Sequence, residues 1–385
     1  MPDTIALRRD LHRFPELGLA LPRTQAKILE ALDGLGLNIR VGENVSSVSC
    51  VLDGDREGPT ILLRADMDAL PMPEDTGLDF ASHTDGVMHG CGHDAHTAML
   101  VAAARILHQC RGQLAGRVLF MFQPGEEGHH GARCMIEEGL LDADRVGQVF
   151  RAFAVHQTPA YASGTISGRA GPFMASADFF RIVVTGRGGH AAGPHVTRDP
   201  IPTACEIVQA IQTAVARRIN IFDPAIISVT QLIAGTTTNV IPETAEIRGT
   251  IRTLSNDTRV AVSEMLQRLA AGIAAAHEMG AAVEVDQVYP VTVNDEACAE
   301  WALSVAAKSF GAERVIRMPR PVMGSEDFSY VLNEVPGAMV FLGTCPPDIE
   351  PGHAAVNHSN RMVIDEAAMA TGVEMYVQAA LSALT

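Results

Sequence analysis

The sequence predicts an α/β protein with a mostly parallel sheet flanked by helices and an inserted ferredoxin-like α+β domain. Three observations support this fold class. Short continuous apolar runs, typical of strands buried on both faces, alternate with helical patterns outside the middle of the chain. Between residues 175 and 290 the order of elements changes to β-α-β-β-α-β, which is that of a ferredoxin-like unit. A length of 385 residues also exceeds one ordinary hydrophobic core.

We therefore expect a first domain formed by residues 1–174 and 291–385. Apolar residues at helical spacing predict its helices, over residues 3–14, 24–35, 95–107, 296–310 and 365–384. Continuous apolar runs predict its strands, over residues 47–52, 60–64, 117–123, 150–156 and 338–342.

The inserted domain is expected at residues 175–290. Alternating apolar and polar residues predict four strands, over residues 176–185, 225–233, 243–254 and 282–288. Helical patterns lie between them at residues 201–219 and 257–277, and Asp257 is expected to cap the second helix.

Composition narrows the possible functions. The net charge of −16 argues against binding to nucleic-acid phosphates or to an anionic membrane surface. The seven cysteines are scattered and include no C-x-x-C, which indicates reduced thiols and a cytoplasmic protein. No signal peptide and no membrane-spanning run are visible. A soluble cytoplasmic protein is therefore expected.

The stretch Met88–Thr97, MHGCGHDAHT, concentrates groups that can bind a metal ion. Cys91 and His93 are separated by Gly92, and on an extended or sharply turned backbone their side chains would point the same way. A thiolate and an imidazole suit a borderline-soft divalent ion. Asp94 stands where the N-cap of the following helix is expected. By itself this pattern is equally compatible with a buried structural cysteine and surface histidines.

Further metal-compatible residues follow the other predicted core strands. Asp66 and Asp68 come after residues 60–64, Glu126 and Glu127 after residues 117–123, and His156 ends the run 150–156. The carboxyl ends of such strands are where open α/β sheets place their chemistry. Adjacent carboxylates in an extended segment point opposite ways, so one can bind metal while the other acts as a base. His12 is interpreted as structural.

With these residues identified, the chain resembles the M20 metallopeptidase/amidohydrolase family, in its aminoacylase-like branch of hippurate hydrolases and indole-acetyl-amino-acid hydrolases. The resemblance runs from about residue 5 to the C-terminus. Its motifs here are HRFPELG, LLRADMDALPM, MHGCGHDAHT, FQPGEEG, GRGGHAA, TNVIPETAEIRGTIRT, GSEDFSY and NHSN. It implies that the first domain is a metal-binding catalytic domain and that the insertion is a lid and dimerisation domain.

The resemblance also implies roles for individual residues. The metal ligands would be Cys91, His93, Glu127, His156 and His358. Glu126 would be the general base and Asp68 an orienting aspartate, while Asp66 stands where more distant relatives have a ligand histidine. His190, Asn239 and Arg252 resemble lid-domain residues that reach the substrate. This chain departs from the family pattern at two places, at Gln157 and Thr158 and again at Asn360 and Met362. Both places are expected near the pocket wall.

The implied activity is metal-dependent hydrolysis of N-acyl or N-aroyl amino acids to a carboxylic acid and a free amino acid. One or two divalent ions (Zn, Mn, Co or Ni) would activate water, and Glu126 would take its proton. Arg252 and Asn239 are expected to clamp the substrate carboxylate. Alternatives are a metallo-dipeptidase or carboxypeptidase of the same family, a thiol hydrolase using Cys91, or a non-catalytic binding module.

The expected assembly is a homodimer formed through the inserted domain. The strand over residues 176–185 would pair edge to edge with its symmetry mate. His190 of one chain would then reach the metal site of the other.

Overall fold

The computed structural model describes all 385 residues, and the chain divides into two compact units. Unit 1 comprises residues Met1–Phe173, Val293–Arg320 and Asp327–Thr385. Unit 2 comprises Met174–Thr292 and a short return segment, Pro321–Glu326, which lies outside the range expected for the insertion. No helix combines the length and the apolar character that crossing a membrane requires.

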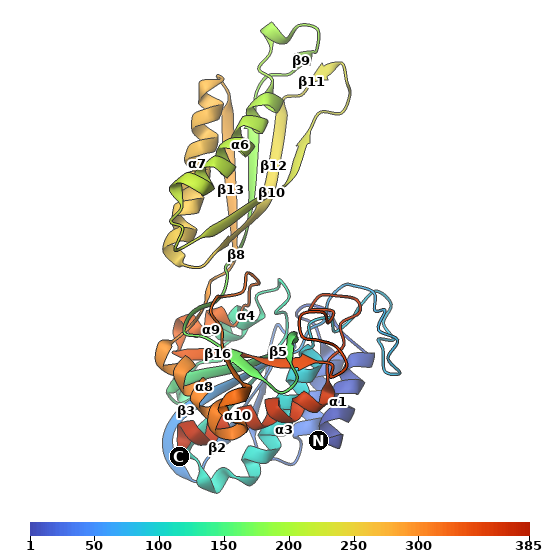
Figure 1. The fold of residues 1–385 in the computed structure, drawn as a ribbon, viewed down its shortest axis with the longest axis vertical. Helices are drawn as coiled ribbons and strands as arrows, with labels where there is room; N and C mark the ends of the chain where they lie inside the picture. The colour runs from blue at the N-terminus through green and yellow to red at the C-terminus, as the bar shows by residue number, and fades with distance from the viewer. The chain divides into compact units, whose positions relative to one another are not determined.

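Unit 1 is built on an eight-stranded sheet in the order β1-β2-β4-β3-β5-β16-β6-β15. Figure 1 labels its strands β2, β3, β5 and β16. The central strands β4, β3, β5 and β16 run parallel, whereas β1 and β2 pair antiparallel at one edge. The strands are β1 (Asn38–Val41), β2 (Val48–Asp53), β3 (Arg56–Asp66), β4 (Ala115–Gln123), β5 (Val149–Ala162), β6 (Ile166–Gly168), β15 (Val315–Arg317) and β16 (Gly337–Cys345). The C-terminal ends of β3, β4 and β5 therefore meet at one edge of the sheet.

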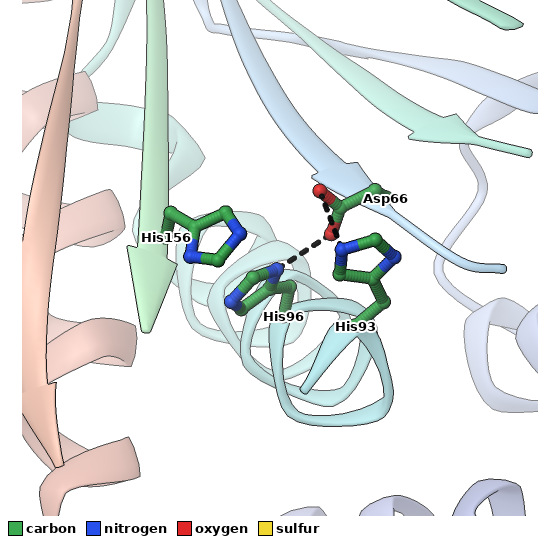
Figure 2. A group of neighbouring side chains, drawn as sticks. All are labelled: Asp66, His93, His96 and His156. Atoms are coloured by element: carbon green, nitrogen blue, oxygen red, sulfur yellow. Dashed lines mark hydrogen bonds and ion pairs between the residues drawn. The ribbon is translucent and has the colours of Figure 1, made fainter. Parts of the chain in front are cut away.

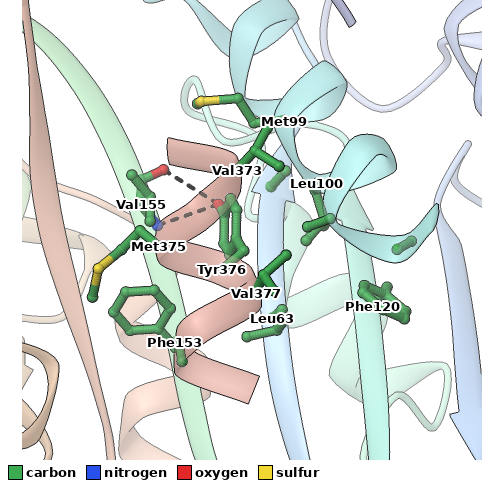
Figure 3. Close-up of a cluster of buried hydrophobic side chains, with 14 of the residues drawn as sticks. Leu63, Met99, Leu100, Phe120, Phe153, Val155, Val373, Met375, Tyr376 and Val377 are labelled. Carbon is green, nitrogen blue, oxygen red and sulfur yellow. Dashed lines mark hydrogen bonds between the residues drawn. The ribbon is translucent and has the colours of Figure 1, made fainter. Parts of the chain in front are cut away.

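Helices α3 and α10 pack against each other and against the central strands of this sheet. Figure 3 shows the apolar side chains buried between them. Gly372 permits the close approach, because a Cβ there would lie 2.1 Å from Met99 Sδ. The buried Tyr376 hydroxyl donates to the Arg64 carbonyl at 2.6 Å. The helices of unit 1 are α1 (Pro2–Arg13), α2 (Pro22–Leu32), α3 (His93–Gln109), α4 (Gly131–Glu137), α5 (Ala143–Val146), α8 (Glu296–Phe310), α9 (Ser329–Glu334) and α10 (Met369–Leu384).

Unit 2 has a four-stranded antiparallel sheet in the order β10-β12-β8-β13, with helices α6 and α7 packed against it. This is the strand order of a ferredoxin-like unit. Its elements are β8 (Ala177–Thr185), α6 (Pro200–Arg218), β10 (Ala225–Ala234), β12 (Thr244–Thr253), α7 (Asn256–Ala276) and β13 (Gly280–Tyr289), with a small pair formed by β9 (Gly189–His190) and β11 (Val240–Ile241). The strands β7 (Gly171–Met174) and β14 (Thr292–Asn294) form a further pair.

Two details of unit 2 correct the sequence analysis. The strand over residues 176–185 is not an edge strand, because β8 pairs with β12 on one side and with β13 on the other. It cannot pair with a second chain, and the free edges belong to β10 and β13. The cap of α7 is Ser255, whose hydroxyl accepts the Thr258 backbone N–H at 3.1 Å, and not Asp257.

Candidate metal centre

A sharp turn before α3 brings Cys91 and His93 to the same point. Gly92 has φ of +82°, in the left-handed region that favours glycine, and α3 begins at the next residue. Asp94 is therefore inside the first helical turn and is not the N-cap. Its carboxylate instead lies 2.7 Å from His12 Nδ1 and 2.7 Å from Arg8 Nε. His12 is fully buried in this contact, which fits the structural role expected for it.

All five side chains named as ligands in the sequence analysis lie together. The ligand atoms of Cys91, His93 and Glu127 are within 4.8 Å of one another. Cys91 Sγ is 3.5 Å from His156 Nε2, and His358 Nε2 is 3.1 Å from Glu127 Oε1. The His358 side chain is 55 % exposed, whereas Cys91, His93 and His156 are buried. The group is therefore accessible from the His358 side.

The charges in this group favour a cation. Close contact with the Cys91 sulfur and the Glu127 carboxylate raises the pKa of His358 to about 10. Burial disfavours the charged form of His93, but the negative charges of Asp66 and Cys91 outweigh it and raise its pKa well above the ordinary value. Burial and the neighbouring His96 lower the pKa of His156 well below the ordinary value, so its ring is neutral.

Unpaired polar atoms show that the donor set fits a metal ion. Neither ring nitrogen of the buried His93 has a hydrogen-bond partner, although they lie 3.4 Å from Asp68 and 3.5 Å from Asp66. Glu127 Oε1 also makes no hydrogen bond of suitable geometry. Buried polar atoms without partners are costly, and a bound ion would satisfy them. Sulfur, nitrogen and oxygen donors together suit a borderline divalent ion.

A second group of side chains, Asp66, His93, His96 and His156 (Figure 2), shares His93 and His156 with the first group. Both ring nitrogens of His96 are already occupied: Nδ1 lies 2.5 Å from Asp66 Oδ1, and Nε2 accepts the Gln157 backbone N–H at 2.8 Å. His96 is therefore a support for the site and not a free ligand. The sequence analysis missed it, although residues three apart on a helix share a face and His93 is three positions earlier.

Asp66 also belongs to this supporting layer. Burial opposes its ionisation, but the charges of Arg64, His93 and His96 outweigh burial and hold its pKa well below the ordinary value. Arg64 Nη1 donates to Asp66 Oδ2 at 2.7 Å. A charged arginine behind Asp66 keeps this carboxylate ionised, and the carboxylate in turn fixes the His96 ring.

Asp68 positions the two glutamates that follow β4. Its carboxylate oxygens accept the backbone N–H groups of Glu126 and Glu127, each at 3.0 Å. The two glutamate side chains then diverge. Glu127 joins the group with Cys91 and His93, whereas the Glu126 carboxylate lies within 4.8 Å of Asp327.

A family comparison decides what kind of protein carries this site. The model of the peptidase family M20/M25/M40 matches residues 62–382. The chain belongs to this family.

Similar proteins agree with that assignment. An N-acetylcysteine deacetylase of Bacillus subtilis is 41% identical over 88% of this chain and 88% of its own length. The thermostable carboxypeptidase 1 of Saccharolobus solfataricus is 37% identical over 96% of this chain and 92% of its own length. The crystal structure of a dinuclear metal-binding M20 peptidase from Bacillus subtilis is 35% identical with a TM-score of 0.85, and the match covers 100% of this chain and 98% of that one. The protein is thus an M20 hydrolase, and metal-dependent amide hydrolysis is the chemistry of its site.

In this M20 enzyme the four positions that depart from the family pattern differ in burial: Gln157 and Met362 are buried, whereas Thr158 and Asn360 are half-buried. The Gln157 side chain is fully buried and donates to the Cys91 carbonyl at 2.8 Å. Met362 is 1% exposed and belongs to the main hydrophobic core. The Asn360 carbonyl accepts the Asp75 backbone N–H at 2.8 Å.

The three substrate-reaching residues expected in the M20 insertion lie in unit 2, at two separate places. His190 in β9 is exposed, and its Nδ1 accepts the Ala192 backbone N–H at 3.0 Å. Asn239 is its neighbour, because the Asn239 carbonyl accepts the Ala191 backbone N–H. Arg252 is near the opposite end of β12 from this pair, roughly 25 Å along the strand from Thr244. Asn239 and Arg252 of one chain therefore cannot clamp the same carboxylate.

Proposed function

We propose that the protein hydrolyses the amide bond of N-acyl or N-aroyl amino acids, releasing a carboxylic acid and a free amino acid. The observation that carries this proposal is the convergence of Cys91, His93, Glu127, His156 and His358 on one point. The deacetylase among the similar proteins supports an acyl amino acid as the substrate class.

The converging side chains would hold one or two divalent ions, of Zn, Mn, Co or Ni. Such an ion, when bound, lowers the pKa of water to about 7 and polarises a carbonyl group. The dinuclear site named for the similar Bacillus subtilis structure supports two ions. The neutral His156 ring supports ligation through Nε2, because its Nδ1 donates to the Gln157 carbonyl at 2.7 Å.

Glu126 would act as the general base. It is buried, and the backbone hydrogen bond to Asp68 holds its segment in place. It would take a proton from the attacking water and return it to the leaving amine. Proton transfer of this kind contributes roughly 10²–10⁴-fold to the rate. Asp68 would be a positioning residue, because its carboxylate accepts the backbone N–H groups of Glu126 and Glu127 and lies 3.4 Å from His93 Nδ1.

Arg252 would bind the free carboxylate of the amino acid. It is half-buried and forms no ion pair; its Nη1 donates long hydrogen bonds to the Ser176 carbonyl at 3.4 Å and the Ser325 hydroxyl at 3.5 Å. Burial lowers the pKa of Arg252, although the negative charge of Asp178 acts to raise it. A partly desolvated guanidinium without an acid partner suits a carboxylate ligand, which accepts two parallel hydrogen bonds.

The working unit would be a homodimer formed through unit 2. Its edge strand β10 exposes three large apolar side chains, Ile226, Leu232 and Ile233, between 45% and 51% accessible. An unpaired apolar edge of this kind is normally covered. His190 and Asn239 of one chain would serve the metal site of the other, where His190 could donate to the oxyanion, while Arg252 would act separately.

Two other activities have some support. The similar carboxypeptidase favours cleavage of peptides with a free carboxyl terminus. The 3.5 Å distance between Cys91 Sγ and His156 Nε2 is also compatible with a thiol nucleophile and its base. In a thiol enzyme, His93, Glu127 and His358 would have no role in catalysis.

Chelation and metal add-back separate these possibilities. The purified enzyme would be assayed on N-acetyl and N-benzoyl amino acids and on dipeptides, before chelation, after it, and after addition of Zn, Mn or Co. We expect loss and recovery of activity, with the N-acyl amino acids turned over faster than the dipeptides. Activity that survives complete metal removal would support the thiol enzyme, and a preference for dipeptides would support the peptidase.

A further inference from the structure

Gln157 connects the separate chain segments that carry the proposed metal ligands. Gln157 follows His156 in β5, and its side chain is fully buried. Its Nε2 donates to the Cys91 carbonyl at 2.8 Å, and its Oε1 accepts the Thr344 hydroxyl at 2.7 Å. Its backbone N–H donates to His96 Nε2, and its carbonyl accepts His156 Nδ1–H at 2.7 Å.

These partners fix the orientation of the amide. The Cys91 carbonyl can only accept a hydrogen bond, so the NH₂ group of Gln157 must face it. The Thr344 hydroxyl then meets the amide oxygen. The amide also packs against Gly92, where a Cβ would lie 2.4 Å from Gln157 Nε2. Glycine at position 92 thus provides both the left-handed turn and the space that the amide occupies.

A third ligand-bearing segment joins at the same carbonyl group. Asn357, which precedes His358, directs its Nδ2 to the Cys91 carbonyl at 3.2 Å and to the Gln157 carbonyl at 3.3 Å. The segments of Cys91, His156 and His358 are therefore tied together by two side-chain amides.

We propose that Gln157 is a positioning residue of the metal site: its side-chain amide holds the Cys91 carbonyl so that the Cys91 thiol and the His156 ring face one point. This inference rests on the proposed function, because it assumes that these side chains bind metal. Groups that orient metal ligands typically cost about 10–100-fold in metal affinity when they are removed.

The test compares metal affinity in two variants of Gln157. Gln157→Met keeps the length of the side chain and removes both hydrogen bonds. Gln157→Glu keeps an acceptor for Thr344 but directs a second acceptor at the Cys91 carbonyl. Affinity for Zn and Co would be measured by chelator competition, and the thiolate-to-Co(II) absorption band would report ligation by Cys91.

A matched control is another buried side-chain amide away from the site. Asn294 is 1% exposed and bonds to the Arg169 and Met339 carbonyls at 2.9 Å and to the Met339 backbone N–H at 2.7 Å. Asn294→Leu loses comparable hydrogen bonds without touching a ligand segment. Thr344→Val releases only the far end of Gln157 and should have a smaller effect in the same direction.

We expect both Gln157 variants to bind metal about 10–100-fold more weakly and to shift or weaken the thiolate band, with Asn294→Leu unchanged. Wild-type affinity and an unchanged band in a folded Gln157 variant would overturn the inference. An equal loss of affinity in Asn294→Leu would also overturn it, as a general effect of destabilisation. If wild-type protein bound neither Zn nor Co, the metal site itself, and with it the proposed function, would be wrong.

Discussion

Asp68 Oδ1 accepts the backbone N–H of Glu126 at 3.0 Å. Its second oxygen makes the equivalent bond to the next residue, Glu127. One carboxylate therefore sets the position of two glutamates whose side chains point to different groups.

Asp68→Asn should lower kcat by about 10–100-fold with saturating metal. An amide has one acceptor oxygen, so its NH₂ group would face one of the two backbone N–H groups. The matched control is Asp295→Asn: Asp295 accepts a backbone N–H at 2.9 Å as the N-cap of α8, where asparagine serves equally well. Steady-state kinetics that show equal kcat values for both variants would rule out the positioning role.

Glu126→Gln should keep its metal and lose turnover. The glutamine is isosteric and preserves the backbone bond to Asp68, but it cannot accept a proton. We expect kcat to fall roughly 10²–10⁴-fold while elemental analysis shows wild-type metal content. A variant with near wild-type kcat would show that another group is the base.

Arg252→Lys should raise KM about 10–100-fold for substrates with a free carboxylate, because lysine cannot form two parallel hydrogen bonds. Hydrolysis of the matching neutral ester of the same N-acyl amino acid should change little. Arg248→Lys is the control, since Arg248 lies on the same strand but is already paired with Glu246. Equal losses on the acid and on its ester would contradict a carboxylate-binding role.

Glu74→Gln should remove a contribution to the free energy of unfolding that depends on pH. Burial opposes ionisation of Glu74, but hydrogen bonds with His12, the Thr76 hydroxyl and the Ser82 backbone N–H outweigh it and lower its pKa to about 2. Because the folded-state pKa lies below the unfolded one, this stability is complete above about pH 4.5 and is lost as the pH falls toward 2.

Denaturant unfolding of wild type and Glu74→Gln should therefore differ by about 1–3 kcal/mol near pH 6, and the gap should narrow toward pH 3. Glu30→Gln is the control, because Glu30 is 71% exposed and pairs only with Lys27. A gap that stays constant over this pH range would mean that packing, and not the charge of Glu74, is responsible.

Complementation tests the shared site. His190→Ala and Glu126→Ala should each be inactive, and mixing them should restore part of the activity through hybrid dimers with one intact site. Losing an oxyanion donor such as His190 should cost roughly 10²–10³ in kcat. Folded variants that exchange subunits, shown by mass-tagged chains, yet remain inactive would exclude a site shared between chains.

The sequence predicted the fold well where strands are buried on both faces. The continuous apolar runs that became β3, β4 and β5 could be recognised locally. The interior position of β8 could not, because alternation shows which face is buried but not which strands are neighbours. The capping of α7 by Ser255 was missed because three consecutive residues, Ser255, Asn256 and Asp257, offered capping side chains.

For the site, residues at strand ends and the family resemblance together pointed to the converging side chains and to Asp68, but not to His96 and Gln157 as supports. The helical spacing from His93 was the one local signal for His96, and the partners of His96 and Gln157, Asp66 and Thr344, are 30 and 187 positions away in the sequence. The distance between Asn239 and Arg252 could not be predicted either. Both residues belong to one sequence motif, and only the length of β12 separates them.

The ligand-bearing segments span almost the whole chain: Cys91 and Asn357 are in contact across 266 positions, with all of unit 2 between them. On the ribosome, the early segments emerge and can fold long before position 358 is made. A chain that stops short of that position keeps the Cys91 loop but lacks one side of the metal site. The full set of proposed ligands would therefore be available only once synthesis of the chain is nearly complete.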